Sequence, residues 1–143
     1  MLHQCSKMFY KSFSFIMVCA ALSYAIKLPS ELQEYVDDLH KICISQSGIS
    51  EDDYLAYDVE NNPHDQKLQC YMKCLMLEAK WMNSAGEIQY EFIIESAHPE
   101  IKDLLVAALN KCRNIEDGGN LCQKASNFNS CMYVADPVNW FLI

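Results

Sequence analysis

The stretch QCYMKCLML, Gln69–Leu77, places Cys70 and Cys74 four residues apart in an apolar run without glycine or proline. Its apolar residues recur with helical periodicity, which predicts a helix over roughly residues 64–81. Side chains at i and i+4 of a helix have Cβ atoms about 5–6 Å apart, whereas a disulfide needs about 3.8 Å. Cys70 and Cys74 are therefore expected to bond to two different partners elsewhere in the chain.

The same helix is predicted to lie at the centre of the fold. Apolar side chains cover most of its circumference and leave a narrow polar strip, mainly Gln69, Lys73 and Lys80. A helix that is apolar nearly all round is normally buried by its neighbours. No segment of the chain alternates convincingly with period two, and helical periodicity occurs throughout. The sequence therefore predicts a compact all-α domain in which the other helices pack around this one.

Five further helices are expected, each bounded by turn or capping residues. The first begins near Ser30, with Ser30 and Gln33 placed as a capping box, and ends at Gly48. The second opens at Ser50 with acidic residues in its first turn. The remaining three carry the apolar residues of 88–94, 101–112 and 121–132.

Residues 1–25 have the pattern of a secretory signal peptide. Lys7 and Lys11 precede an apolar stretch over residues 13–24, and Ser23 and Ala25 fit the small-residue rule for the cleavage site. A membrane-spanning helix needs about 20 apolar residues, and this stretch is shorter. We expect a single exported domain over residues 26–143.

The charge of the chain argues against two classes of partner. The net charge is −8, and removal of the signal peptide would move it to about −10 because that segment contains two lysines and no acid. Such an excess of negative charge repels nucleic acids and anionic membrane surfaces, and no concentrated basic patch offsets it. Neither a nucleic acid nor a membrane is expected as a partner.

Six cysteines remain after removal of the signal peptide, an even number in an oxidising compartment, which favours a disulfide framework. A zinc site is disfavoured because the spacings do not fit and His40, His64 and His98 are scattered. Cys122 and Cys131 lie nine residues apart, on opposite sides of one predicted helix, and should also bond to different partners. Excluding these two local pairs leaves ten of the fifteen possible connectivities open.

The complete cysteine pattern resembles the insect odorant-binding protein family, which comprises pheromone-binding and general odorant-binding proteins. The pattern is Cys43-x26-Cys70-x3-Cys74-x37-Cys112-x9-Cys122-x8-Cys131, and the resemblance covers essentially all of residues 26–143. It implies six helices that enclose an apolar cavity. It also implies the pairs Cys43–Cys74, Cys70–Cys122 and Cys112–Cys131.

The apolar C-terminal tail, residues 137–143, is expected to fold back against the helices, because an apolar terminus left in water promotes aggregation. The resemblance implies that such a tail forms a wall or lid of the cavity. We predict that the ligand contacts adaptable methionines and other apolar side chains of two helices, the last cysteine's helix and the tail. These residues are Met72, Leu75, Met76, Val106, Leu109, Met132, Trp140, Phe141 and Leu142.

The predicted function is that of a secreted carrier of small hydrophobic molecules such as odorants or pheromones, with an odorant receptor as a further partner. We expect a monomer or a homodimer, with no catalytic residue, cofactor or metal. An enzyme is disfavoured because no G-x-S-x-G motif or Cys/His nucleophile pattern occurs. A secreted helical protein that acts on a receptor or host protein through its surface remains the alternative.

Overall fold

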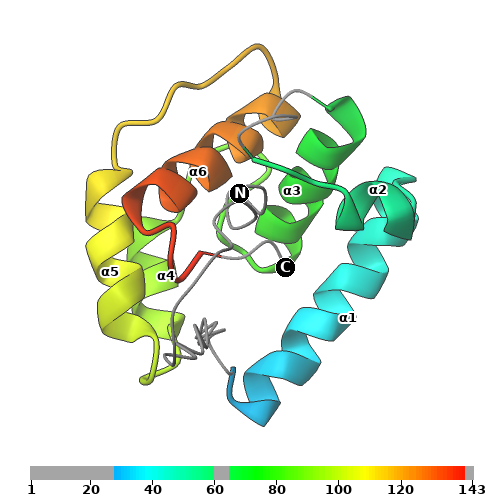
Figure 1. The fold of residues 1–143 in the computed structure, drawn as a ribbon. Helices are drawn as coiled ribbons and strands as arrows, with labels where there is room; N and C mark the ends of the chain where they lie inside the picture. The colour runs from blue at the N-terminus through cyan, green and yellow to red at the C-terminus, as the bar shows by residue number, and fades with distance from the viewer. Residues whose placement is uncertain (1–27, 60–64, 141–143) are drawn as a thin grey trace, which may run out of the picture.

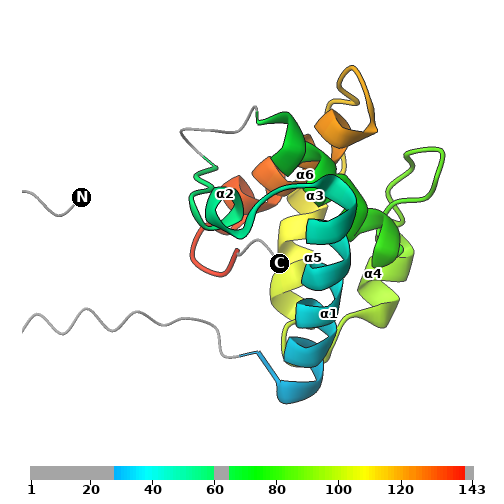
Figure 2. The same ribbon diagram turned by 90° about the vertical axis from the view of Figure 1, so that its right-hand side faces the viewer.

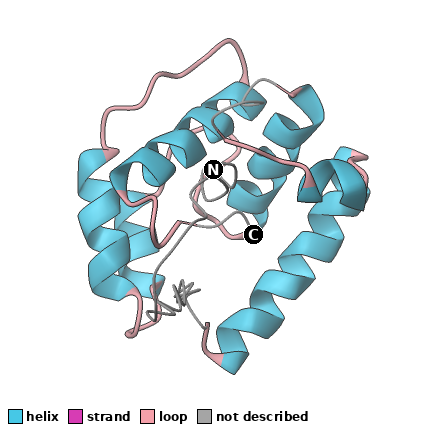
Figure 3. Ribbon diagram, viewed as in Figure 1, coloured by secondary structure: helices cyan, strands magenta, loops and turns pink. Residues whose placement is uncertain are grey.

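The computed structural model describes residues 28–59 and 65–140, which form six helices and no extended sheet (Figures 1 and 3). The all-α prediction is confirmed. The only strand-like pairing within the described residues is an isolated bridge between Met82 and Ile88. The helices are α1 (Ser30–Ser47), α2 (Glu51–Leu55), α3 (Gln66–Glu78), α4 (Tyr90–Ser96), α5 (Lys102–Lys111) and α6 (Leu121–Ala135).

Helix α3 lies at the centre, as its apolar circumference predicts. It packs against α1 on one side and α6 on the other (Figures 1 and 2). Six of its 13 residues are buried, and the Tyr71 side chain is fully enclosed. The helix separates two clusters of buried side chains, one shared mainly with α1 and one shared with α4, α5 and α6.

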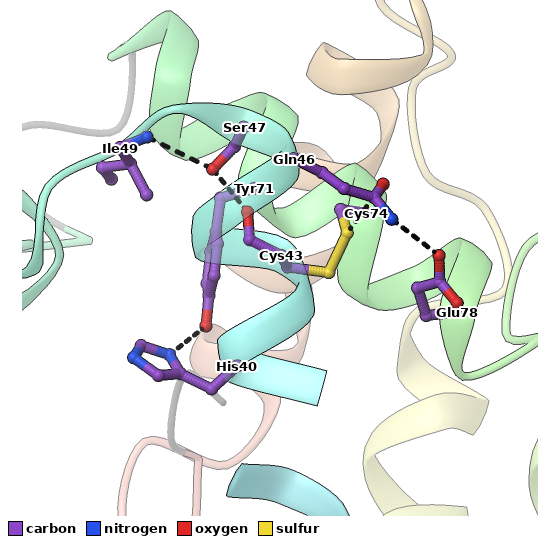
Figure 4. Close-up of a disulfide and its surroundings, with 8 residues drawn as sticks. All are labelled: His40, Cys43, Gln46, Ser47, Ile49, Tyr71, Cys74 and Glu78. Carbon is purple, nitrogen blue, oxygen red and sulfur yellow. Dashed lines mark hydrogen bonds between the residues drawn. A yellow bond between two sulfur atoms is a disulfide. The ribbon is translucent and has the colours of Figure 1, made fainter. Parts of the chain in front are cut away.

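Three disulfides attach the neighbouring helices to this centre. Cys70 and Cys74 bond to different partners, as helix geometry requires, and so do Cys122 and Cys131. One bond joins α1 to α3 (Figure 4), the second joins α3 to α6, and the third joins the end of α5 to α6. The pairs are Cys43–Cys74, Cys70–Cys122 and Cys112–Cys131, the set that the resemblance implies.

The beginning of α1 differs from its prediction. Ser30 is already inside the helix, Pro29 occupies the N-cap position, and no side chain caps the first turn. Gln33 does not turn back to the helix start, because its Nε2 donates to Asp37 Oδ1 at 2.8 Å one turn further along. The capping box was therefore wrong. Ser50 does cap α2, where its hydroxyl accepts from the backbone N–H of Asp53 at 3.1 Å.

Helix α3 also ends earlier than the predicted residue 81. Lys80 has a φ of 60°, in the left-handed region that no α-helix continues through. The backbone N–H groups of Trp81 and Met82 then donate to the carbonyl of Met76 at 2.8 and 3.0 Å. These two bonds occupy a carbonyl at the helix end and turn Trp81 back toward the body of the protein.

The described part of the C-terminal tail lies against the helices. The ring of Trp140 packs against two tyrosine rings. Its centroid lies 5.4 Å from that of Tyr133 on α6 and 6.4 Å from that of Tyr57, which follows α2. The prediction that the tail folds back therefore holds as far as Trp140. The remaining tail residues, Phe141, Leu142 and Ile143, lie outside the described residues, as do the predicted signal peptide over 1–25 and His64.

Candidate ligand-binding site

An apolar pocket of about 150 Å³ lies between the C-terminal end of α3, helices α5 and α6, and the segment after α6. Its described walls come from the four regions just named and from Trp81. None of the described lining residues comes from α1 or α2, and the pocket is partly open to solvent. The lining residues are Leu75, Met76, Ala79, Trp81, Ile101, Leu104, Leu105, Ala108, Phe128, Asn129, Met132, Asp136, Asn139 and Trp140.

Two backbone features place Trp81 in the pocket wall. Its N–H is held by the Met76 carbonyl, as described above, and its own carbonyl accepts from the N–H of Gln89 at 2.8 Å. The indole then packs edge-on against Phe128 of α6, with ring centroids 6.4 Å apart and an interplanar angle of 82°. Edge-to-face contacts of this kind add to the energy of apolar burial. The loop between α3 and α4 therefore contributes a fixed aromatic surface.

Helix α5 contributes one continuous apolar face. Ile101, Leu104, Leu105 and Ala108 are spaced i, i+3, i+4 and i+7, the spacing of residues on one side of a helix. Ala108 is buried, whereas the Leu104 side chain is 44% exposed. A leucine that lines a pocket and still contacts water lies at its rim, so Leu104 marks the opening.

The segment after α6 closes the opposite side with a tight turn. Pro137 cannot continue the helix. The Asp136 carboxylate accepts from both the backbone N–H and the side-chain Nδ2 of Asn139, at 3.3 and 2.7 Å. The N–H of Trp140 donates to the Asp136 carbonyl at 3.0 Å. These bonds fold the chain so that Trp140 reaches the pocket.

The pocket brings together part of the predicted ligand site. Four of the nine residues line it: Leu75, Met76, Met132 and Trp140. That they contact a ligand stays a prediction. Phe141 and Leu142 lie outside the described residues.

Three predicted residues lie elsewhere. Met72 and Leu109 are almost fully buried in the core cluster, and Val106 is half-buried without lining the pocket. The face of α5 that meets the pocket is a different one from the face that carries Val106 and Leu109, and both faces are apolar. Trp81 was not among the predicted residues, although a tryptophan at the end of the predicted central helix was a usable signal.

A buried hydroxyl lies close to the pocket wall. Tyr57 Oη is inaccessible to solvent and has no hydrogen-bond partner among the described residues. Burial, with a smaller contribution from the negative charge of Asp58, raises the pKa of Tyr57 to about 12. The ring packs against both core clusters and faces Trp140, so this side chain lies where the two halves of the core meet.

A metal site and a membrane-spanning helix are two other features that residues 28–59 and 65–140 could contain. No three His, Cys, Asp or Glu side chains there are grouped in a way that could hold a metal ion. None of the six helices combines the length and the apolar composition needed to cross a membrane.

Comparison with known proteins defines the class. A model of the PBP/GOBP family matches residues 26–135, which is most of the chain, so the protein belongs to this family. Its members are odorant-binding carrier proteins that are secreted and that bind small hydrophobic ligands; they are not enzymes. The chain is 26% identical over 132 residues to general odorant-binding protein 99a of Drosophila melanogaster, a match that covers 82% of this chain and 87% of the relative.

Solved structures share the fold. Odorant-binding protein 5 of Apis mellifera superimposes with a TM-score of 0.71 at 23% identity, over 82% of this chain and 98% of the bee protein. The fatty acid binding protein OBP56a from the oral disk of the blowfly Phormia regina superimposes with a TM-score of 0.60 at 22% identity, over 78% of this chain and 97% of that protein. At this level of identity the likeness concerns the fold.

Proposed function

We propose that this protein is a secreted carrier that takes up small hydrophobic molecules in the pocket between α3, α5 and α6 and transports them through an aqueous extracellular fluid. Family membership supports the binding of such ligands, and the apolar lining of the pocket is the observation that carries the proposal. The signal-peptide pattern of residues 1–25 supports secretion. The name of the blowfly relative, a fatty acid binding protein, describes one cargo class known on this fold.

The pocket can supply useful affinity through the hydrophobic effect. Burial of apolar surface is favourable by roughly 25 cal/mol per Å², so a volatile that buries about 300 Å² gains several kcal/mol before ordering costs. A cavity of comparable volume in another protein binds benzene. A molecule of this size fits within the walls, and a longer one can extend through the opening at Leu104. Micromolar dissociation constants are the expected scale.

The three disulfides make such a pocket tolerable in a small domain. A cavity lowers stability because its lining side chains lose contacts and apolar burial. A disulfide typically contributes about 2–4 kcal/mol. Three of them connect α1, α3, α5 and α6, and together they offset the cost of leaving the pocket between α3, α5 and α6 unfilled.

The test is uptake of an apolar fluorescent probe by the oxidised protein, residues 26–143. Leu104→Gln places an amide at the pocket rim and should weaken probe binding about tenfold or more, since the amide stays hydrated there. Ile42→Gln is the matched control, because Ile42 is similarly exposed, at 41% against 44%, and lies on α1 away from the pocket. The site is wrong if the two variants bind the probe equally well.

The surface-acting alternative makes a different prediction about the purified protein. A carrier should retain an apolar molecule from its source or take one up from solution, which native mass spectrometry detects as a mass increase that organic extraction removes. A protein that acts only through its surface should show one unliganded mass and no probe binding. That result would replace the carrier proposal.

A further inference from the structure

The polar side chains that line the pocket all come from α6 and from the turn that follows it. They are Asn129, Asp136 and Asn139, and Asp136 is the only charged residue among the described lining residues. All three are half-buried. A ligand with one polar end would place that end here, because the rest of the described wall is hydrocarbon and aromatic.

The Asp136 carboxylate has unused capacity to accept hydrogen bonds. An ionised carboxylate offers about four lone-pair sites on its two oxygens. The structure shows two bonds to it, from the backbone and side-chain nitrogens of Asn139. These bonds fix the carboxylate in place as part of the turn. A donor on the ligand can therefore be received by an oriented acceptor without rearrangement of the protein.

No cation in the described chain pairs with this carboxylate. The positive group that the structure connects to the same turn is the ammonium of Lys111, and it donates to the backbone carbonyl of Ala135 at 2.9 Å. The ion pairs of the described residues involve other acids. Asp136 therefore makes no ion pair among the described residues, and its negative charge lies among the residues that line the pocket.

From this arrangement we infer that the protein selects apolar ligands that end in a hydrogen-bond donor, an alcohol or a protonated amine, and discriminates against carboxylates. The inference rests on the proposed function. A carboxylate ligand would place a second negative charge beside Asp136 in a half-buried space, where the two like charges repel each other. An alcohol gains a charge-assisted hydrogen bond, and an ammonium group also gains Coulombic attraction.

The experiment compares four molecules of eight carbon atoms each at pH 7: octan-1-ol, octylammonium, methyl heptyl ether and octanoate. Their affinities follow from displacement of the apolar probe. We expect octan-1-ol and octylammonium to bind more tightly than the ether, which can only accept, and octanoate to bind least. Asp136→Asn should narrow the gap between octanol and octanoate by about tenfold, the effect of one pKa unit of charge interaction. Measurement in 0.5 M salt isolates the local effect, since the Debye length is then only about 4 Å.

Glu95→Gln is the matched control. It removes the same unit of negative charge from an exposed position on α4 outside the pocket lining, so it should leave the order of affinities unchanged. The inference is overturned if octanoate binds the unmodified protein as well as octan-1-ol, or if both variants change selectivity equally. The order in the unmodified protein decides the matter if Asp136→Asn does not fold. Failure of the probe and all four molecules to bind would instead contradict the carrier function itself.

Discussion

His40 Nδ1 of α1 lies 2.6 Å from Tyr71 Oη of α3, and the Cys43–Cys74 disulfide joins the same two helices (Figure 4). The other ring nitrogen, Nε2, lies 3.2 Å from both carboxylate oxygens of Glu51 on α2. One imidazole therefore joins three helices. Tyr54 packs against the same imidazole, with ring centroids 4.5 Å apart. The junction is polar at its centre and aromatic around it.

Removal of the Tyr71 hydroxyl should weaken this junction. Tyr71→Phe leaves a partly buried imidazole nitrogen without its partner, and we expect a loss of about 1–2 kcal/mol in the free energy of unfolding. Urea denaturation followed by circular dichroism measures it. Tyr35→Phe is the control, because the Tyr35 ring on α1 is 47% exposed and its variant should lie within about 0.5 kcal/mol of the unmodified protein. Equal stabilities of the two variants would show that the hydrogen bond contributes nothing.

Removal of the Tyr57 hydroxyl should have the opposite effect. A buried hydroxyl without a partner costs about 1–3 kcal/mol relative to water, and Tyr57→Phe deletes it while keeping the ring against Trp140. We expect the variant to be more stable by about 1 kcal/mol at pH 7. A destabilised variant would mean that the hydroxyl has a partner beyond the described residues.

The same substitution should change the response to alkali. The pKa of Tyr57 is about 12 in the folded protein, above its ordinary value of 10.0, because burial disfavours the phenolate. The unfolded chain releases the proton of this tyrosine near pH 10, whereas the folded protein keeps it until about pH 12. The free energy of unfolding of the unmodified protein is therefore unaffected by this group below pH 10 and falls as the pH rises from 10 to 12. The stability advantage of Tyr57→Phe should therefore grow across that window. Phenolate absorbance in the folded protein should also lose one late-titrating group in the variant.

Intrinsic fluorescence should report pocket occupancy without an added probe. The chain contains two tryptophans, Trp81 and Trp140, and both line the pocket. Displacement of water by an apolar ligand should change the emission of each. We expect Trp81→Phe and Trp140→Phe to retain a saturable fluorescence change on addition of octan-1-ol. A ligand that displaces the apolar probe without changing either emission would place binding elsewhere.

The fold could be predicted from the sequence because it depends on the periodicity of apolar residues and on the spacing of the cysteines. The apolar circumference of residues 68–77 identified the central helix, and the i, i+4 spacing of Cys70 and Cys74 required two separate partners. The pairing itself came from the resemblance, because helix geometry left ten sets open. The helix boundaries were harder to predict. The end of α3 depends on the positive φ of Lys80, and the backbone preferences of lysine do not predict a positive φ.

The residues that line the pocket could be predicted only in part, because the lining depends on how the helices pack. Core and pocket walls are built from the same apolar residue types, so composition does not separate Leu109, which is fully buried, from Leu104 at the rim. Which face of α5 meets open space depends on how α5 is placed against α6. Asp136 was not among the residues predicted to line the pocket. Its place in the pocket wall follows from the turn that Asn139 completes.

The disulfides should differ in their contribution to stability. In the chain-entropy description, a bond that closes a longer loop restricts the unfolded chain more. Cys70–Cys122 spans 52 residues and Cys112–Cys131 spans 19. We expect removal of the first by paired alanine substitutions to cost about 4 kcal/mol and removal of the second about 3 kcal/mol. Urea unfolding under non-reducing conditions gives both values.

Packing around the bonds sharpens this comparison. Cys112 is buried, whereas both Cys70 and Cys122 are half-buried. If only the cavity left by the missing sulfur atoms mattered, removal of Cys112–Cys131 would therefore lower the stability more. The two physical effects therefore predict opposite orders. If the Cys70–Cys122 variant is the less stable one, restriction of the unfolded chain dominates, and the bond between α3 and α6 is the principal covalent support of the helices that form the pocket. The reverse order would assign that role to the packing of the sulfur atoms at the end of α5.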